Sequence, residues 1–311
     1  MPFLKTCKDI ISLTTARLSR DRGALLIFLF HAIFTNQAEI KLGHILPQQG
    51  ITVEHFTRFV TYYRKSGYHF VSPDDVLQGL DKNGLYVMAT FDDGYFNNTL
   101  ALPIMEKYNV PALFFITSEN IIHNKCYWWD IVYRQLRHRG QQKKQINRVM
   151  TKLKSKKHDE IEKFLLAEFG CQAFTPVSDV DRPMTPGELT HFASHPLVYI
   201  GNHTAHHAIL TSYDQEGILA EIGECQNYLE NLLGYKPKMI SYPNGNYNQE
   251  IVAISEQIGF QLGITTEKRK NFLPLPENSA ARLTLGRFTL WGSRSIETMC
   301  AIFRGNIRFN Y

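Results

Sequence analysis

Two groups of side chains in this sequence have the types and spacing of a metal-assisted hydrolytic site. The first is a pair of adjacent carboxylates, Asp92 and Asp93, which directly follows an apolar run and precedes a glycine. Two like charges at close range push their pKa values apart unless a cation lies beside them. One carboxylate can therefore bind a metal while the other acts as a base. By itself, an Asp-Asp-Gly sequence is more often a simple acidic turn.

The second group is a set of histidines. His203 and His207 are four residues apart, and on a helical turn this spacing would direct both imidazoles to the same side, as a shared zinc ion requires. His206 is three residues from His203 and reaches the same side, so the spacing leaves the second ligand open. Together with Asp93, the histidines give a two-histidine, one-carboxylate set. Such sets suit Zn, Fe, Co or Mn, and the sequence predicts a divalent metal without choosing among them.

Short β-branched and aromatic runs alternate with amphipathic stretches along the chain, and these elements must position the polar groups. The expected strands are 25–30, 68–72, 85–91, 112–117, 197–200, 238–242, 260–264 and 283–290. The expected helices include 53–65, 97–108, 186–193, 214–233 and 249–257. This alternation predicts an α/β fold with a parallel sheet, and seven or eight units favour a TIM-like barrel over an open sheet.

Reactive groups in parallel barrels lie in the loops that leave the carboxyl ends of the strands. Polar residues follow or end five of the expected strands in this chain. They are His31, the pair Asp92 and Asp93, the histidines 203, 206 and 207, the Tyr242-Pro243-Asn244 segment, and Arg287. We therefore expect carboxylates, imidazoles and a guanidinium to meet at one end of the barrel.

One region interrupts the alternation. Residues 130–181 have helix-like patterns without a convincing strand, so we expect a helical insertion in a barrel domain of residues 23–311, preceded by an N-terminal extension of residues 1–22. Ten Lys and Arg lie between Arg134 and Lys157 with no Asp or Glu among them, although the whole chain has a net charge of +5. The rest of the chain is therefore acidic, and the positive charge belongs to this basic segment.

The basic segment has three interpretations. A solvated helical face is the simplest. Attraction to an anionic partner, such as a phosphate-bearing lipid-linked glycan precursor or a peripheral membrane contact, is the second. Nucleic acid is the least favoured partner, because no nucleic-acid motif accompanies the charge.

The five cysteines and the longest apolar run bear on the compartment. The cysteines are widely spaced, odd in number and lack a C-x-x-C, which argues against a disulfide framework and fits a reducing environment. The apolar run 23–34 is too short to span a bilayer, and no small-residue cleavage site directly follows it. We expect a buried strand there and a cytoplasmic protein.

Three motifs carry a family resemblance. The stretches Thr90-Phe91-Asp92-Asp93-Gly94, His203-Thr204-Ala205-His206-His207 and Tyr242-Pro243-Asn244-Gly245 occur in that order. This chain thereby resembles the polysaccharide deacetylases with NodB homology, carbohydrate esterase family four, over about residues 25–290. The resemblance implies a distorted (β/α)₇ barrel and a metal-dependent hydrolase that removes N-acetyl groups from the amino sugars of a glycan or glycan precursor.

The same resemblance implies roles for individual residues. Asp92 corresponds to the general base, and Asp93, His203 and His207 correspond to the ligands of one divalent metal ion. Zinc is the first expectation, and Co²⁺, Mn²⁺, Ni²⁺ and Fe²⁺ are compatible with the same ligands.

Two departures from the family pattern concern the groups around the base. Many members have an arginine in the third motif where this chain has Ser241; Arg287, on a later strand, can replace it or can be a surface residue. Many members also take their general acid from a C-terminal histidine, but no histidine follows His207 here. Biofilm-polysaccharide deacetylases instead use a histidine after the first strand, where this chain has His31. The alternative for His31 is a buried structural histidine.

Substrate contacts are expected from the loop at Tyr242, Pro243 and Asn244 and from the aromatic pair Trp128 and Trp129. Flat aromatic faces suit sugar rings, although both indoles can instead pack the insertion onto the barrel. Two other functions fit the same residues. One is a metal-dependent hydrolase of another amide or ester, and the other is a non-catalytic glycan-binding protein.

Overall fold

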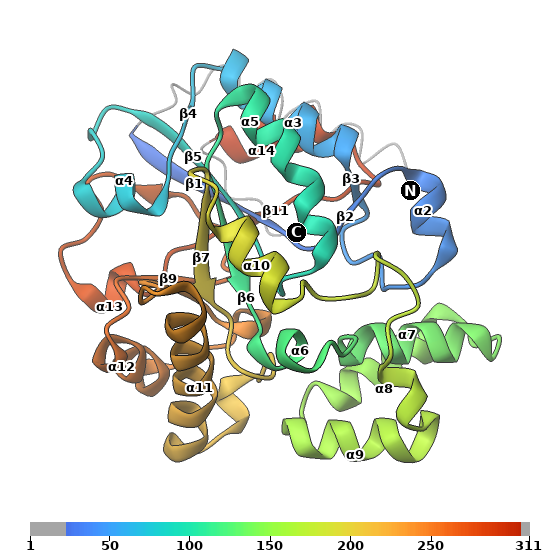
Figure 1. Cartoon of the computed structure of the whole chain (residues 1–311). Coiled ribbons are helices and arrows are strands. Elements are labelled where there is room, and N and C mark those ends of the chain that lie inside the picture. Colours follow the sequence, from blue (N-terminus) through green and yellow to red (C-terminus); the bar gives the residue numbers. More distant parts are fainter. Residues whose placement is uncertain (1–22, 306–311) are drawn as a thin grey trace.

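The structure of the protein is a computed structural model that describes residues 23–305 (Figure 1). The expected extension at residues 1–22, which includes Cys7, lies outside the described residues. A nine-stranded sheet forms the centre. Its strands are β1 Ala24–Phe30, β4 His69–Phe70, β5 Leu85–Phe91, β6 Ala112–Ile116, β7 Val198–Asn202, β8 Met239–Ser241, β9 Leu262–Ile264, β10 Asn271–Phe272 and β11 Phe288–Thr289. Two short strands, β2 Ile33–Phe34 and β3 Ile51–Thr52, pair separately.

The sheet curls back on itself. Strand β1 pairs in parallel with β5 along its whole length and with β11 at its carboxyl end. Leu285, shortly before β11, forms a parallel bridge with Ile264 at the end of β9. The parallel strands β1, β5, β6, β7, β8, β9 and β11 therefore follow one another around the sheet. The expected distorted (β/α)₇ barrel is confirmed.

Alternation along the strands decides which side chains face the barrel interior. Successive residues of a strand point to opposite faces. The interior cluster includes Leu25, Ile27, Met88, Leu113, Phe115, Met239, Leu262, Ile264 and Leu285. The intervening residues, such as Phe28, Phe30 and Phe91, join a second cluster against the covering helices. Because β5 is buried on both faces, its run of apolar residues is nearly continuous, as in other parallel sheets.

Helices cover the outside of the sheet (Figure 1). The longer ones are α3 Val53–Lys65, α5 Leu102–Tyr108, α10 Pro186–Ala193, α11 Gln215–Leu233, α12 Gln249–Ile258 and α14 Ile296–Arg304. Shorter ones are α2 Gln37–Leu42, α4 Pro73–Gln78, α6 Ser118–His123 and α13 Ser279–Arg282, with 3-10 turns at η1 Phe96–Ala101, η3 Leu210–Ser212 and η4 Pro243–Gly245. Helix α10 begins with a capping box in which Thr185 and Glu188 satisfy each other's backbone N–H groups.

The last expected strand, 283–290, is shorter than its sequence pattern predicts. Strand pairing with β1 is limited to Phe288 and Thr289. The side chain of Asn271 takes the place of a neighbouring strand at Gly286, where it accepts from the backbone N–H and donates to the backbone carbonyl, both at 2.9 Å. A side chain therefore satisfies backbone groups that a regular ladder would pair.

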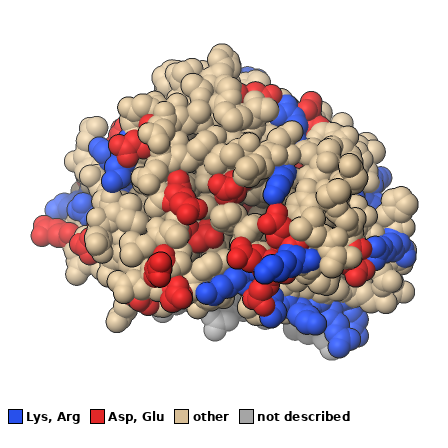
Figure 2. Space-filling model, turned by 60° about the horizontal axis from the view of Figure 1, so that its bottom comes forward, with Lys and Arg blue, Asp and Glu red and all other residues tan. Residues whose placement is uncertain are grey.

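The segment that leaves the barrel after β6 contains α7 Trp128–His138, α8 Lys143–Leu153, α9 His158–Phe169 and the turn η2 Cys171–Phe174. These helices lie side by side at the lower right of Figure 1. They enclose a separate apolar cluster that also contains Phe34 and Tyr95 of the barrel. Figure 2 brings this side forward, and Lys and Arg side chains gather on it at the lower right.

Two expectations about the apolar run and the cysteines can be compared with the structure. Residues 24–30 form the fully buried strand β1, as expected. Cys126, Cys171, Cys225 and Cys300 are all free thiols. Within residues 23–305, no helix has both the length and the apolar character that crossing a bilayer requires.

Candidate active site

A buried ion pair between Asp92 and Arg287 lies at the carboxyl end of the barrel. Asp92 takes the next inward position after Thr90, and Arg287 takes the next inward position after Leu285. The two terminal nitrogens of the Arg287 guanidinium donate to Asp92: Nη1 to Oδ1 at 2.8 Å and Nη2 to Oδ2 at 2.5 Å. Burial alone would raise the pKa of Asp92, but the positive charge of Arg287 outweighs it and holds that pKa well below its usual range. Asp92 is therefore ionised.

Two hydroxyl groups also contact the guanidinium of this ion pair. Arg287 also donates to the hydroxyl of Ser241 at 3.0 Å and to that of Thr90 at 3.2 Å. The serine that stands where many family members have an arginine thus contacts the arginine of a later strand. The side chain of Arg287 is 1% exposed, and it is not a surface residue.

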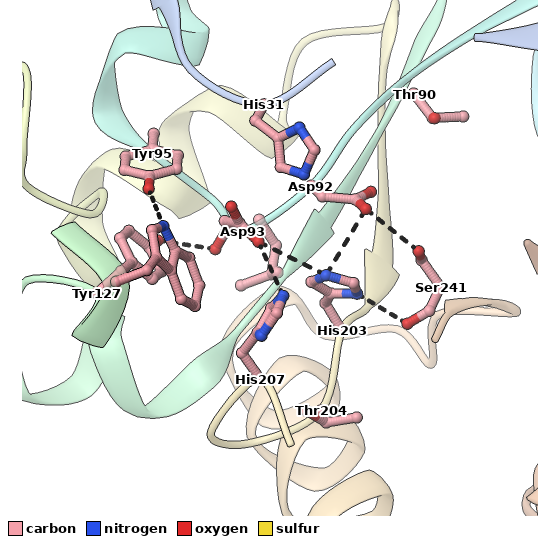
Figure 3. Close-up of polar contacts among 12 residues, drawn as sticks. His31, Thr90, Asp92, Asp93, Tyr95, Tyr127, His203, Thr204, His207 and Ser241 are labelled. Atoms are coloured by element: carbon pink, nitrogen blue, oxygen red, sulfur yellow. Dashed lines mark hydrogen bonds and ion pairs between the residues drawn. The ribbon is translucent and has the colours of Figure 1, made fainter. Parts of the chain in front are cut away.

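Asp93 lies between two imidazoles on the other side of the site (Figure 3). Its Oδ1 is 3.6 Å from His203 Nε2 and 3.5 Å from His207 Nε2. One ligand atom from each of the three residues lies within 4.8 Å of the others, and this is the one cluster of its kind in residues 23–305. Both carboxylate oxygens of Asp93 are buried without a hydrogen-bond donor among the described residues. A buried carboxylate without donors is costly, and a cation would offset that cost.

The two imidazoles are suited to bind a cation. Burial lowers the pKa of both His203 and His207, so the rings are neutral. The Nδ1–H of His203 donates to the backbone carbonyl of Ser241 at 2.7 Å, which leaves Nε2 as a lone pair directed at Asp93. A hydrogen bond from the far nitrogen to a carbonyl is the usual way in which a metal-binding histidine is oriented. The donor set therefore fits a divalent cation.

The loop after β7 brings the histidines together without a helical turn. Residues 203–209 are not helical, and the backbone has positive φ angles at Thr204 (66°) and His207 (53°). Asp93 (82°) and Asn244 (57°) share this left-handed conformation, which is uncommon for residues other than glycine. Four of the six such residues in the described chain thus lie in the site loops. Clustering of this kind is typical of functional sites, where surrounding packing holds unfavourable backbone angles.

His206 takes no part in the cluster. Its Nδ1 lies 3.0 Å from Glu221, and its ring lies against that of His158 at 3.9 Å between centroids, tilted by 32°. Glu221 also accepts from the backbone N–H of His206 at 3.0 Å. The carboxylate on α11 therefore turns His206 away from Asp93, and the second imidazole beside Asp93 is that of His207.

His31 leaves β1 beside Asp92 and points toward it (Figure 3). Its Nδ1 lies 2.9 Å from Gln49 Oε1. The amide of Gln49 is fixed because its nitrogen donates to two carbonyls, Leu29 at 2.7 Å and Leu290 at 3.1 Å. Gln49 Oε1 must then accept, so His31 carries its proton on Nδ1 and has a free Nε2. Burial lowers the pKa of His31 to about 4, and the ring is neutral.

Aromatic side chains support the loop after β7 from the insertion side. The ring of Trp129 packs against His207 at 4.5 Å between centroids and stacks on Tyr127. The indole N–H of Trp129 donates to Tyr95 at 2.9 Å, and the hydroxyl of Tyr127 donates to the Asp93 carbonyl at 2.8 Å. Because only 6% of the surface of Trp129 is exposed, most of its side chain packs against neighbouring residues. Trp128 is half-buried.

These residues open into a cavity of about 860 Å³ between the barrel and the helices α7 to α9. The lining includes His31, Asp92, Arg287, His207, Trp128, Trp129 and Asn244. Tyr242 and Pro243 do not line it. Both are buried, and Tyr242 packs in the core between β8 and α12. Among the residues expected to contact substrate, the structure thus brings Trp128, Trp129 and Asn244 to the cavity.

Several cavity residues were not singled out from the sequence. Gln49 lies in a loop and belongs to none of the three motifs. Trp291 lines the cavity with 43% of its surface exposed. Lys154 was noted only as part of the basic segment. A signal for Trp291 existed, because it follows the last expected strand as the other site residues follow theirs.

Comparisons with known proteins bear on the family and fold of this chain. The model of the family described as polysaccharide deacetylase matches residues 80–263, more than half of the chain. The polysaccharide deacetylase homologue YxkH of Bacillus subtilis (strain 168) is 22% identical over 260 residues, which cover 82% of this chain and 69% of YxkH.

Solved structures of deacetylases share the fold. The Streptococcus pyogenes deacetylase PplD, solved with acetate, superposes with a TM-score of 0.60 at 19% identity and covers 91% of this chain and 99% of its own. IcaB from Ammonifex degensii gives 0.59 at 17% identity, with 91% and 97% covered. The de-N-acetylase of Aggregatibacter actinomycetemcomitans gives 0.62 at 15% identity, with 89% and 99% covered. On the family match over more than half of its length, this chain belongs to the polysaccharide deacetylases.

Proposed function

We propose that this protein is a metal-dependent hydrolase that removes N-acetyl groups from the amino sugars of a glycan or glycan precursor. The observation that carries the proposal is the division of roles between two adjacent carboxylates. Asp92 is paired with Arg287 and ionised, whereas Asp93 has no donor among the described residues and faces two neutral imidazoles. Asp93, His203 and His207 would hold the divalent cation, for which zinc is the first candidate.

The cation, when bound, would polarise the acetyl carbonyl and lower the pKa of a water molecule. Asp92 accepts the proton of the attacking water, because Arg287 keeps its carboxylate ionised and fixes its orientation. Arg287 is a positioning residue in this scheme, since its contacts are with Asp92 and the two hydroxyls. The loop at Asn244 borders the cavity where the acetyl oxygen would lie.

His31 is the candidate for the acid that protonates the departing amine. Its Nε2 is free because Gln49 holds the proton on Nδ1. The resting ring is neutral, so the proton that Asp92 takes from the water must pass to Nε2 of His31 before His31 can donate it. The amine would leave with this proton, and the products would be acetate and the free amino sugar.

The cavity favours a glycan over a small metabolite. Its volume of about 860 Å³ exceeds what a single small amide needs, and Trp128 and Trp291 offer aromatic surface to sugar rings. Hydrolysis of another amide or ester remains the second candidate, because the same residues serve either bond. A non-catalytic glycan-binding role has less support, since a binding protein needs neither an ionised Asp92 nor the three metal ligands.

Acetate release tests the proposal. Purified protein is assayed on N-acetylglucosamine oligosaccharides and on lipid-linked precursors, before and after chelation and with zinc or cobalt added back. We expect release that chelation abolishes, metal restores and Asp92→Asn eliminates. An Asp92→Asn protein with full turnover would refute the assignment of the base. Stoichiometric metal without release would favour another amide, and absence of both would favour the binding protein.

A further inference from the structure

One face of helix α8 forms a wall of the active-site cavity. The lining residues Lys143, Asn147, Met150 and Lys154 recur at intervals of three and four residues. Residues at this spacing lie on the same side of a helix. The helix therefore presents one continuous face to the cavity, with a lysine at each end and uncharged lining residues between them.

The cavity has an excess of positive charge. Asp92 is the one carboxylate among its described lining residues, and Arg287 already pairs with it. The other charged lining residues are Arg137, Lys143, Lys154 and Lys156. Lys156 pairs with Glu160 at 2.8 Å. The remaining three have no carboxylate within 4.0 Å in residues 23–305, and their charge is free to attract an anion.

Lys154 is the cavity cation that contacts a site loop of the barrel. Its Nζ donates to Oδ1 of Asn244, in the loop after β8, at 2.9 Å. Lys154 and His207 both line the cavity, so the ammonium borders the same space as that imidazole. An ammonium has three N–H donors, and the bond to Asn244 uses one of them. Two donors of Lys154 can therefore serve a ligand.

We infer that Lys154 binds a phosphoryl group attached to the sugar in the metal site, so that the substrate is a phosphate ester of an acetylated amino sugar. This inference rests on the proposed deacetylase function. A lysine ammonium binds phosphate as a compact point charge. Lys143, at the other end of the wall, and Arg137, on α7, raise the local concentration of anionic ligand.

The uncharged part of the lining indicates which kind of group is attached to the other side of the phosphate. Leu46, Pro47 and Trp128 line the same cavity. An alkyl or prenyl chain on the phosphate would bury apolar surface against them, whereas a nucleotide would place a polar base and ribose there. The lining thus favours a lipid phosphate over a nucleoside diphosphate as the source of the phosphoryl group.

Binding of already deacetylated ligands tests the inference without turnover. The octyl phosphodiester of glucosamine and octyl glucosaminide carry the same amine and differ by the phosphate alone. Calorimetry on the zinc-loaded full chain should show that the phosphodiester binds about tenfold more tightly, as expected for one charge-assisted contact. Lys154→Ala should remove this preference and Lys154→Arg should restore it. Lys152→Ala, an exposed position of the same helix that does not line the cavity, is the matched control and should keep it.

The outcomes separate this inference from the proposed function. Equal binding of the two ligands by the wild type, or equal weakening of both by Lys154→Ala, would overturn the phosphate site and leave Lys154 as a structural link to Asn244. Acetate release from the acetylated forms of the same ligands is measured in parallel. Its absence would refute the deacetylase while the binding preference still decides the phosphate site. Tighter binding of uridine-diphosphate-glucosamine than of the octyl phosphodiester would keep the phosphate site and overturn the lipid assignment.

Discussion

Arg287 and Asp92 are 195 residues apart in the chain, yet each oxygen of the carboxylate accepts a hydrogen bond from the guanidinium. The pair forms because the sheet closes through the segment 285–289, which lies between β9 and β1. Arg287 then faces the barrel interior opposite Asp92. Ser241 stands where many family members have the third-motif arginine, and it accepts a hydrogen bond from Arg287.

Replacing Arg287 should affect both stability and the ionisation of the base. Arg287→Met leaves a buried carboxylate without its counter-charge, and we expect the free energy of unfolding to fall by about 3–5 kcal/mol. The pKa of Asp92 should rise, so the acid limb of the pH–rate profile should move to higher pH. Urea unfolding and kcat/KM against pH measure the two effects. Arg294→Met, at an exposed position, should change stability by less than about 0.5 kcal/mol. An unchanged acid limb in Arg287→Met would contradict the positioning role.

Asp93→Asn should separate metal binding from folding. The substitution removes one of two adjacent buried charges, and we expect the metal-free variant to be at least as stable as the metal-free wild type. Zinc at 100 times its Kd should stabilise the wild type by about 2.7 kcal/mol and should not stabilise the variant. Thermal unfolding and elemental analysis provide the readouts, with Asp92→Asn as the control that retains metal. Stoichiometric zinc in Asp93→Asn would disprove its role as a ligand.

Gln49 should affect turnover by fixing which ring nitrogen of His31 carries the proton. Gln49→Met keeps the side-chain volume but removes the acceptor for Nδ1–H, so the proton can move to Nε2. We expect turnover to fall about 10-fold to 100-fold, which corresponds to about 1.4–2.7 kcal/mol in the activation barrier, while zinc content stays the same. Nitrogen NMR of His31 should report a single tautomer in the wild type and a mixture in the variant. In the His31→Ala background, Gln49→Met should cost little more; a full additional loss would show that Gln49 acts elsewhere.

Asp130 should make the stability of the metal-free protein depend on pH. Burial is the main cause that raises the pKa of Asp130 to about 7, against the opposing hydrogen bond from Tyr95. This folded-state pKa exceeds the unfolded value of about 3.9. The native state therefore binds more protons, and the stabilisation by the neutral acid is fully present below about pH 4 and is lost as the pH rises through 7.

Urea unfolding from pH 4.5 to 8, in the presence of a chelator, measures this dependence. The wild type should lose about 3 kcal/mol relative to Asp130→Asn across this range, since each pKa unit corresponds to about 1.4 kcal/mol. Asn at this position can still accept the hydrogen bond that Leu46 N–H now donates at 2.8 Å. Parallel stability curves for the two proteins would show that Asp130 does not titrate in this range.

Sequence patterns alone determined the α/β alternation, the barrel, most of its strands and the two carboxylates and histidines of the site. These features depend on short-range periodicity and on residues adjacent in the chain. Strands β1, β5 and β6 agree with their expected limits to within one residue. Each is a nearly continuous apolar run, which is typical of a strand in a parallel sheet that is covered on both faces.

The tertiary structure decided the contacts that join distant segments. It placed Arg287 on Asp92, turned His206 toward Glu221 through the non-helical loop after β7, and brought Gln49 and Lys154 to the same cavity. The spacing of residues along the chain does not predict these contacts. Which guanidinium reaches which carboxylate depends on how the barrel closes. Which histidine faces Asp93 depends on backbone angles that packing imposes against the intrinsic preference of the residues.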